Sequence, residues 1–402
     1  MTRRPDPAAR DGNRPVPAGL DITEFRVDVP ESELEQLRRR LAETRWPDEL
    51  ADVGWDYGVP VTYLQELAEY WRTHYDWRAA EAAFNALPQF RTELDGADVY
   101  FVHLRSPHPG ALPLILTHGW PGSVLEFTGI AAELADPTLV GGDPGDAFHV
   151  VVPSLPGYGF SGPTRDRGWT PPRVADAWHA LMRGLGYASF VAYGGDWGSR
   201  VTRSLALRHP DDVLGICVTE PAGGVARGAP DAAPPDGERW RASAQRAQHF
   251  DREESAYGAL QGTKPQTLSY ALTDSPLGQL AWIVEKFHGW TAARRSPDEA
   301  VPRDLLLTNV MLYWLTGTAG SSARLYYETM HSPDGWAQRG YCTVPTAVAV
   351  FGEDTSLPVR SRAERYSNIV RWTEFARGGH FPGLEQPGVL GDELRAAFSS
   401  LR

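Results

Sequence analysis

One short stretch, residues 191–199, constrains the fold more than any other part of this 402-residue chain. Apolar residues that favour a β-strand run directly into Gly194-Gly195-Asp196-Trp197-Gly198, and a helical pattern follows over residues 199–209. This is the layout of a nucleophile elbow, a tight strand-to-helix corner that lifts one side chain above the end of a sheet. Small residues flank such a corner because its backbone leaves no room for Cβ atoms.

The residue at the tip of this corner is Asp196, where Ser or Cys would support acyl transfer. A carboxylate that attacks carbon forms an alkyl ester, so the pattern predicts displacement at a saturated carbon. The alternative interpretation is a helix N-cap, the usual role of an aspartate between a strand and a helix. The flanking glycines and a histidine placed late in the chain favour the nucleophile.

Composition excludes several classes of partner. The net charge is −12, with 39 basic and 51 acidic residues and no long basic run, which argues against nucleic acid. The two cysteines, Cys217 and Cys342, are too few for a disulfide framework and favour a reducing compartment. No run of about 18 apolar residues is present, so we expect no membrane span. The sequence therefore predicts a soluble, cytoplasmic protein.

Hydrophobic patterning divides the chain into five parts. We expect a disordered tail over residues 1–20 and an N-terminal unit of helices and a β-hairpin over residues 21–110. Strands alternate with helices over residues 111–220. Residues 221–342 begin with a Gly/Ala/Pro-rich linker and then become helical and aromatic. The strand pattern returns over residues 343–402. Continuous Val/Ile/Leu runs with helical crossovers favour a parallel sheet covered on both faces.

An insertion between two late strands is typical of a lid over the strand ends. We therefore predict an α/β-hydrolase fold, with a mostly parallel central sheet, a helical lid inserted between late strands and an N-terminal helical and meander extension.

His380 follows the last predicted strand, where this fold places its general base. The acid that orients the histidine should follow the preceding strand, and two carboxylates, Glu353 and Asp354, are found there. Asp354 is the preferred residue and Glu353 the alternative. The acid would fix the tautomer of the imidazole and stabilise the imidazolium that forms when water is deprotonated.

Two backbone amides should form an oxyanion hole. One comes from the loop after an early strand, His118-Gly119-Trp120-Pro121, and the other from the residue after the nucleophile. Trp120 and Trp197 are the predicted donors, with their rings lining the pocket; plain core packing is the alternative for either ring. His118 is expected to brace the loop.

Residues 157–162 (GYGFSG) match the dinucleotide-binding pattern letter by letter. We reject this interpretation because the helix that should open at the third glycine is not expected until residue 171, so no helix N-terminus could hold a pyrophosphate there. The 11 histidines are scattered, with no metal-ligand spacing. We expect neither a cofactor nor a metal.

Four motifs carry a family resemblance: residues 118–123 (HGWPGS), 157–161 (GYGFS), 194–199 (GGDWGS) and 377–381 (RGGHF). Together they resemble the microsomal-type epoxide hydrolases, in their soluble microbial branch. Segments 262–265, 272–276 and 306–314 are similar to the lid of that family, and residues 20–110 to its N-terminal domain. The resemblance implies that two lid tyrosines, Tyr257 and Tyr326, hydrogen-bond the epoxide oxygen, with Tyr327 as an alternative to the second.

The resemblance implies hydrolysis of an epoxide to a vicinal diol through an Asp196 ester, and a homodimer is compatible with it. Five lid aromatics favour bulky or aryl epoxides as substrates: Trp282, Phe287, Trp290, Tyr313 and Trp314. A biosynthetic and a detoxifying role are both open. A haloalkane dehalogenase also uses an aspartate elbow, and a non-catalytic small-molecule receptor on the same scaffold is the second alternative.

Overall fold

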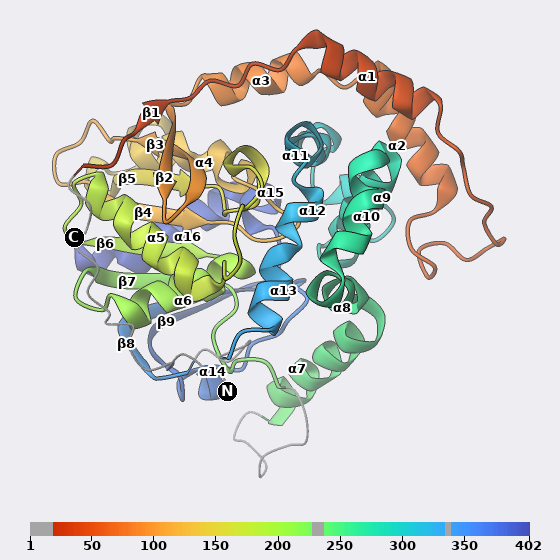
Figure 1. Cartoon of the computed structure of the whole chain (residues 1–402). Helices are drawn as coiled ribbons and strands as arrows, with labels where there is room; N and C mark the ends of the chain where they lie inside the picture. Colours follow the sequence, from red (N-terminus) through yellow and green to blue (C-terminus); the bar gives the residue numbers. More distant parts are fainter. Residues whose placement is uncertain (1–18, 227–236, 334–338) are drawn as a thin grey trace, which may run out of the picture.

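The computed structural model of the chain describes residues 19–226, 237–333 and 339–402 (Figure 1). Nearly all of the expected disordered tail and most of the Gly/Ala/Pro-rich linker lie outside these described residues.

Within the described residues, the strands form one central sheet. In chain order they are β1 (Thr23–Glu24), β2 (Gln89–Leu94), β3 (Ala97–Leu104), β4 (Leu112–Thr117), β5 (Phe148–Pro153), β6 (Phe190–Gly194), β7 (Val213–Val218), β8 (Cys342–Phe351) and β9 (Ser367–Phe375). Their order across the sheet is β1-β2-β3-β5-β4-β6-β7-β8-β9. The strands from β5 to β9 in this order are parallel, and β1, β2 and β3 add an antiparallel edge. The predicted mostly parallel sheet is confirmed.

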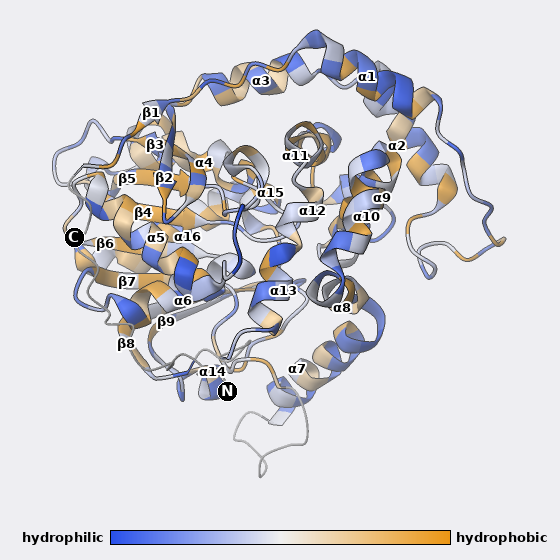
Figure 2. Cartoon of the chain, viewed as in Figure 1, coloured by the Kyte–Doolittle hydropathy of each residue, from blue (hydrophilic) through white to orange (hydrophobic). Residues whose placement is uncertain are grey.

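Apolar runs explain why the central strands lie in the middle of the molecule. Strand β6 is buried at every position, and β4 at all but one. Figure 2 shows this as a block of hydrophobic colour along the central strands. Helices cover both faces of the sheet: α5 (Pro171–Gly184) packs with α6 (Trp197–Arg208) on one, and α4 (Leu125–Ala135), α15 (Pro382–Glu385) and α16 (Pro387–Phe398) pack together on the other.

The lid is the helical segment between β7 and β8, and it consists of α7 to α13. Its helices are α7 (Gly237–His249), α8 (Ala256–Thr263), α9 (Pro265–Asp274), α10 (Pro276–Gly289), α11 (Arg303–Thr316), α12 (Ala319–Ser322) and α13 (Arg324–Met330). The prediction of a helical insertion between late strands is confirmed. After β8, a short helix, α14 (Arg360–Ala363), leads to β9.

The N-terminal helices α1 (Glu31–Ala42), α2 (Val61–Thr73) and α3 (Trp77–Asn85) arch over the lid (Figure 1). Arg40 donates to the carbonyl of Asp274 at 2.6 Å, and the Tyr70 hydroxyl donates to Asp304 at 2.8 Å. These bonds join the N-terminal helices to the lid helices α9 and α11. The hairpin expected in the same unit is present, but β2 and β3 extend the central sheet.

The N-terminal unit also contains α3, which is nine residues long and has two buried side chains, Trp77 and Phe84. A helix this short falls below the length at which hydrophobic periodicity identifies a helix in a sequence. The side chain of Asp76 caps it by accepting from two backbone amides of the first turn. No helix in the described ranges is long and apolar enough to cross a membrane.

Candidate active site

Asp196 occupies the corner between β6 and α6 with φ 51° and ψ −122°. A non-glycine residue in this region is strained, and such strain persists only where the surroundings hold it. Gly194 and Gly198 supply that support, because their backbones touch and a Cβ on Gly194 would collide with Gly198. The corner therefore holds the Asp196 side chain above the end of the sheet.

The loop after β4 holds one oxygen of this carboxylate. The Trp120 amide donates to Asp196 Oδ1 at 2.8 Å, and a Cβ on Gly119 would collide with the same carboxylate. His118 contacts the Gly119 carbonyl through Nδ1 (2.9 Å) and accepts from the Leu155 amide through Nε2 (3.1 Å). Burial lowers the pKa of His118 to about 4, so the ring is neutral. The prediction that His118 braces this loop is confirmed.

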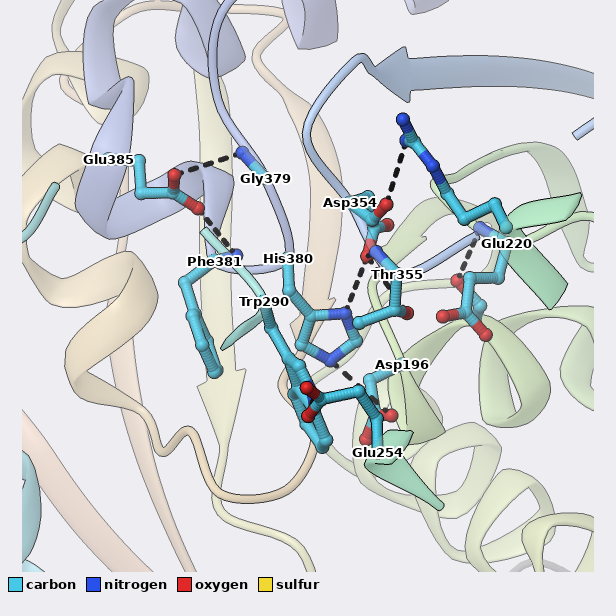
Figure 3. Close-up of polar contacts among 12 residues, drawn as sticks. Asp196, Glu220, Glu254, Trp290, Asp354, Thr355, Gly379, His380, Phe381 and Glu385 are labelled. Carbon is cyan, nitrogen blue, oxygen red and sulfur yellow. Dashed lines mark hydrogen bonds and ion pairs between the residues drawn. The ribbon is translucent and has the colours of Figure 1, made fainter. Parts of the chain in front are cut away.

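His380 lies between two carboxylates (Figure 3). Its Nδ1 is 2.8 Å from Asp354 Oδ1, and its Nε2 is 3.5 Å from Asp196 Oδ2. The His380 amide donates to the carbonyl of Trp290 in the lid at 2.8 Å. Three loops that follow parallel strands, after β6, β8 and β9, thus bring three distant residues together, because the carboxyl ends of parallel strands share one edge of the sheet.

The loop after β8 is fixed from both sides. Asp354 Oδ1 also accepts from the Thr355 amide at 2.6 Å. Arg246, on the lid helix α7, donates to the carbonyl oxygens of Gly352 (2.6 Å) and Asp354 (2.9 Å). Glu353 points elsewhere and pairs with Arg294 at 2.9 Å. Of the two acids that the sequence left open, Asp354 is the one that contacts His380.

The charges around His380 determine its protonation. Burial by itself would lower its pKa, but the charge of Asp354 and the hydrogen bonds and charges of both aspartates outweigh burial and raise the pKa of His380 well above its ordinary value. The two aspartates therefore favour the protonated form of the ring.

Tyr257 on α8 and Tyr326 on α13 face the same space as Asp196. Their ring centroids are 5.8 Å apart, and both residues line a cavity of about 750 Å³ together with Asp196 and His380. The pKa of both phenols is raised well above 10, mainly because they are buried and in part because of the nearby Asp196 charge. Both phenols therefore stay protonated. Tyr327, the alternative to Tyr326, is 36 % exposed and stacks on His331.

The aromatic wall of this cavity differs in part from the predicted one. Of the five predicted lid aromatics only Trp290 lines it, and Phe250 and Tyr366, which the sequence analysis did not select, line it as well. Phe287 and Tyr313 are core residues, and the Tyr313 hydroxyl donates to the Gly122 carbonyl. The Trp197 ring lines the cavity. Trp120, whose ring was also predicted to line the pocket, is not among the lining residues: its ring is buried and stacks on Tyr257 with centroids 4.7 Å apart.

Known protein families match both the N-terminal unit and the remainder of the chain. Residues 22–127 match the family described as epoxide hydrolase N terminus, and residues 113–387 match the alpha/beta hydrolase fold. A putative epoxide hydrolase of Stigmatella aurantiaca is 48% identical over 383 residues, which cover 95% of this chain and 86% of that protein. The chain belongs to the epoxide hydrolase family.

Other relatives agree with this assignment. Epoxide hydrolase 1 of Oryctolagus cuniculus is 33% identical to this epoxide hydrolase, over 95% of this chain and 90% of that protein. The solved structure of Aspergillus niger epoxide hydrolase has a TM-score of 0.83 and 30% identity, over 97% of this chain and 99% of that one. The predicted α/β-hydrolase fold and the predicted epoxide hydrolase activity are confirmed.

Two acids beside the site of this epoxide hydrolase, one buried and one partly buried, were not predicted from the sequence. Glu126 on α4 is 4% exposed, and burial, partly offset by the charge of His380, raises its pKa to about 8. Glu220 follows β7 and lines the cavity. Glu220, Asp354 and His380 are the one group of His, Cys, Asp or Glu in the described ranges spaced closely enough for a metal ion. Within this group, His380 Nδ1 and Asp354 Oδ1 already contact each other at 2.8 Å.

Proposed function

We propose that this protein hydrolyses a bulky or aryl epoxide to a vicinal diol through an ester on Asp196. One observation carries the proposal: a strained carboxylate, a histidine and two protonated phenols all line a single cavity. A carboxylate nucleophile opposite two neutral hydrogen-bond donors suits a strained ring whose carbon is attacked while its oxygen gains charge.

In the first step, Asp196 attacks one ring carbon from the side opposite the breaking C–O bond. Oδ2 is the attacking oxygen, because Oδ1 is held by the Trp120 amide. Tyr257 and Tyr326 donate hydrogen bonds to the ring oxygen, which becomes a hydroxyl. The bond that forms is Asp196 Oδ2 to carbon, and the bond that breaks is that carbon to the ring oxygen.

Formation of the ester changes the protonation of His380. The Asp196 carboxylate is one of the groups that raise the pKa of His380, and the neutral ester no longer does so. The pKa of His380 therefore falls, and the imidazolium loses the proton that balances protonation of the ring oxygen. The ring becomes a general base only after the covalent intermediate exists.

In the second step, neutral His380 takes a proton from water, and the hydroxide attacks the ester carbonyl. Asp354 would hold the imidazole and stabilise the imidazolium. The Trp120 amide, and the Trp197 amide at the first position of α6, would hold the oxyanion on Oδ1. Collapse expels the alcohol, which takes the proton of the new carboxyl group, so Asp196 and His380 return to their starting charges.

The walls of the cavity support bulky or aryl substrates. Rings of Trp197, Phe250, Trp290 and Tyr366 line it beside the reacting groups, and its volume of about 750 Å³ is that of a site for a drug-sized ligand. Aromatic walls of this kind favour a flat or apolar substituent on the epoxide.

Intact-protein mass spectrometry of His380→Gln tests this function. Without the base, the ester should accumulate during incubation with a panel of aryl epoxides, alkyl epoxides and haloalkanes. A mass gain equal to a whole epoxide supports the proposal and identifies an accepted substrate. His209→Gln, a histidine outside the cavity, is the matched control and should turn over without accumulating an adduct.

Other mass changes would replace the proposal. A gain of an alkyl group without its halide would assign a haloalkane dehalogenase. Micromolar binding of a panel compound without any adduct, and without turnover by the wild type, would assign a non-catalytic receptor.

A further inference from the structure

Glu220 reaches the active site from a strand that contributes no residue to the proposed mechanism. It follows β7 by two positions, and its main chain is attached to the elbow. The Glu220 amide donates to Ser199 Oγ at 3.2 Å, and the Thr219 amide donates to the Gly194 carbonyl at 3.4 Å. Ser199 Oγ itself donates to the Gly194 carbonyl at 2.7 Å. Glu220 is thus fixed relative to Asp196 by the same backbone that forms the corner.

The carboxylate of Glu220 lies beside the histidine and its acid. One of its oxygens is within 4.8 Å of both a carboxylate oxygen of Asp354 and a ring nitrogen of His380. Figure 3 shows the Glu220 side chain to the right of Thr355, on the same side of His380 as Asp354. His380 therefore faces three carboxylates, although the proposed mechanism uses only two.

We propose that Glu220 is a second positioning carboxylate for His380, which stabilises the imidazolium during hydrolysis of the ester. This inference rests on the proposed function, because it concerns the step that follows esterification of Asp196. Glu220 would supply beside His380 the negative charge that Asp196 loses when it becomes an ester.

The electrostatic environment makes this exchange of charge possible. Burial, and then the charges of Asp354 and Asp196, raise the pKa of Glu220 to about 7, so its carboxyl group is partly protonated in the resting enzyme. Esterification removes the Asp196 charge and so favours ionised Glu220. The proton leaves through the cavity that Glu220 lines and returns when the Asp196 carboxylate is regenerated.

Charged and titratable groups on the neighbouring elements face the same cluster. Arg200 on α6 favours ionised Glu220, as does protonated His380, and Tyr257 on α8 is neutral because burial raises its pKa. The remaining groups are the three acids on the loops after β6, β7 and β8, and two glutamates on the far side of His380. Burial raises the pKa of Glu126 on α4 to about 8 and that of Glu385 on α15 to about 7. When Asp196 is neutral, His380 and Arg200 are the cations that Glu220 faces.

Single-turnover hydrolysis of the ester tests the proposal directly. The ester is formed by mixing excess enzyme with a limiting amount of an epoxide identified by the His380→Gln experiment, and its decay is followed by rapid quench and mass spectrometry between pH 5 and pH 9. Because decay is a first-order process of enzyme that has already reacted, its rate constant is independent of the fraction of each variant that folds. The variants are Glu220→Gln, Asp354→Asn, the double variant and Glu353→Gln as the matched control.

Glu220→Gln should slow ester hydrolysis by about tenfold, since it weakens but does not remove the base. Loss of the nearby charge lowers the pKa of His380 in the intermediate, so the acid limb of the pH profile should move down by about one pH unit. Formation of the ester should change much less. Glu353→Gln replaces a carboxylate that pairs with Arg294 and should match the wild type in both respects.

The Asp354 variants give the sharpest test. With Glu220 present, Asp354→Asn should lower the rate constant of ester hydrolysis by about 10²-fold. Loss of a triad acid that has no second carboxylate to assist it should lower this rate constant by roughly 10⁴-fold. The double variant should show a larger fold-reduction in this rate constant than the product of the two single reductions. Glu220→Asp should hydrolyse the ester faster than Glu220→Gln.

Three results would overturn the inference. The first is a rate constant and acid limb for Glu220→Gln that coincide with those of Glu353→Gln. The second is a lower yield of ester with an unchanged decay constant, which would assign Glu220 a structural role. The third is failure of every variant, His380→Gln included, to form an ester, and only that result would also reject the proposed function.

Discussion

Helix α6 has a histidine–aspartate contact at each end, and only the longer of the two belongs to the candidate site. At its N-terminal end, His380 Nε2 lies 3.5 Å from Asp196 Oδ2. At its C-terminal end, His209 Nε2 lies 2.9 Å from Asp176 Oδ1. The side chain of Asp176 is 44% exposed, whereas that of Asp196 is 19% exposed. Contact distance alone would select the wrong end of the helix.

What separates the two ends is the surroundings of the carboxylate. Arg208 donates to both oxygens of Asp176, at 2.7 and 2.6 Å, and the His209 ring stacks on His179, so that carboxylate is saturated with partners. At the other end, positive φ fixes Asp196 and the Trp120 amide holds one oxygen, which leaves the second facing a cavity. A nucleophile requires a fixed, partly unsatisfied oxygen and room for a substrate.

The same substitution at each end of α6 should have opposite consequences. Asp196→Asn removes the nucleophile and should reduce turnover of an accepted epoxide by at least about 10⁴-fold. Asp176→Asn, the matched control, should leave kcat and KM unchanged. Diol formation by both variants is measured under multiple turnover, together with the mass of the Asp196→Asn protein.

Full activity of Asp196→Asn would reject Asp196 as the nucleophile, provided that its mass still shows asparagine. Recovery of activity together with a mass change to aspartate would instead report deamidation and support the assignment.

The phenols across the cavity sharpen the contrast at the N-terminal end of α6. Tyr257→Phe or Tyr326→Phe should each slow ester formation by about 10²-fold, because each removes one donor to the developing alkoxide. Hydrolysis of the ester should be nearly unaffected, since neither hydroxyl acts in that step. Rapid-quench measurement of the two steps separates these effects.

Tyr327→Phe provides the control, because this neighbouring tyrosine is exposed and stacks on His331. Equal losses for Tyr326→Phe and Tyr327→Phe would show that the loss reports packing of α13 and not hydrogen bonding to the epoxide.

The sequence predicted those parts of the site that follow from chain order. A glycine-flanked aspartate between a strand and a helix marks the corner, and acids or histidines directly after buried strands meet at one edge of a parallel sheet. By that rule Glu220, which follows β7, carried the same signal as Asp354 and was overlooked. Local sequence could not separate Asp354 from Glu353, because the choice depends on Arg294, about 60 residues away in the chain.

Long-range packing accounts for what the sequence did not reveal. Tyr257 and Tyr326 could be selected only through resemblance to a family, since nothing local distinguishes them from core tyrosines such as Tyr313. The N-terminal helices are attached to the lid by contacts between segments far apart in the chain, and Tyr70 and Asp304 are more than 200 residues apart. Which aromatic residues line the cavity also depends on contacts between distant segments.

The smallest predicted effect concerns the C-terminal end of α6. Although partial burial opposes it, hydrogen bonds from His209 and Arg208 hold the pKa of Asp176 below its ordinary value. A carboxyl group with a lowered pKa stabilises the folded state above its unfolded pKa of about 4, and this contribution is lost as the pH falls through the folded pKa. Asp176→Asn should therefore lower the free energy of unfolding by no more than about 1 kcal/mol at pH 7, because the side chain is 44% exposed and its interactions are screened by salt.

Urea unfolding of the wild type and Asp176→Asn at several pH values measures this contribution, and the difference should shrink below about pH 4. A loss of several kcal/mol at pH 7 would mean that the His209–Asp176 contact makes a large contribution to the stability of the fold. Since α6 connects the two ends, that result would also require kcat to be remeasured in this variant, because disorder at the C-terminal end of the helix would then reach Asp196. An unchanged kcat with a small loss of stability would mean that, of the two contacts, only the one between His380 and Asp196 affects the reaction.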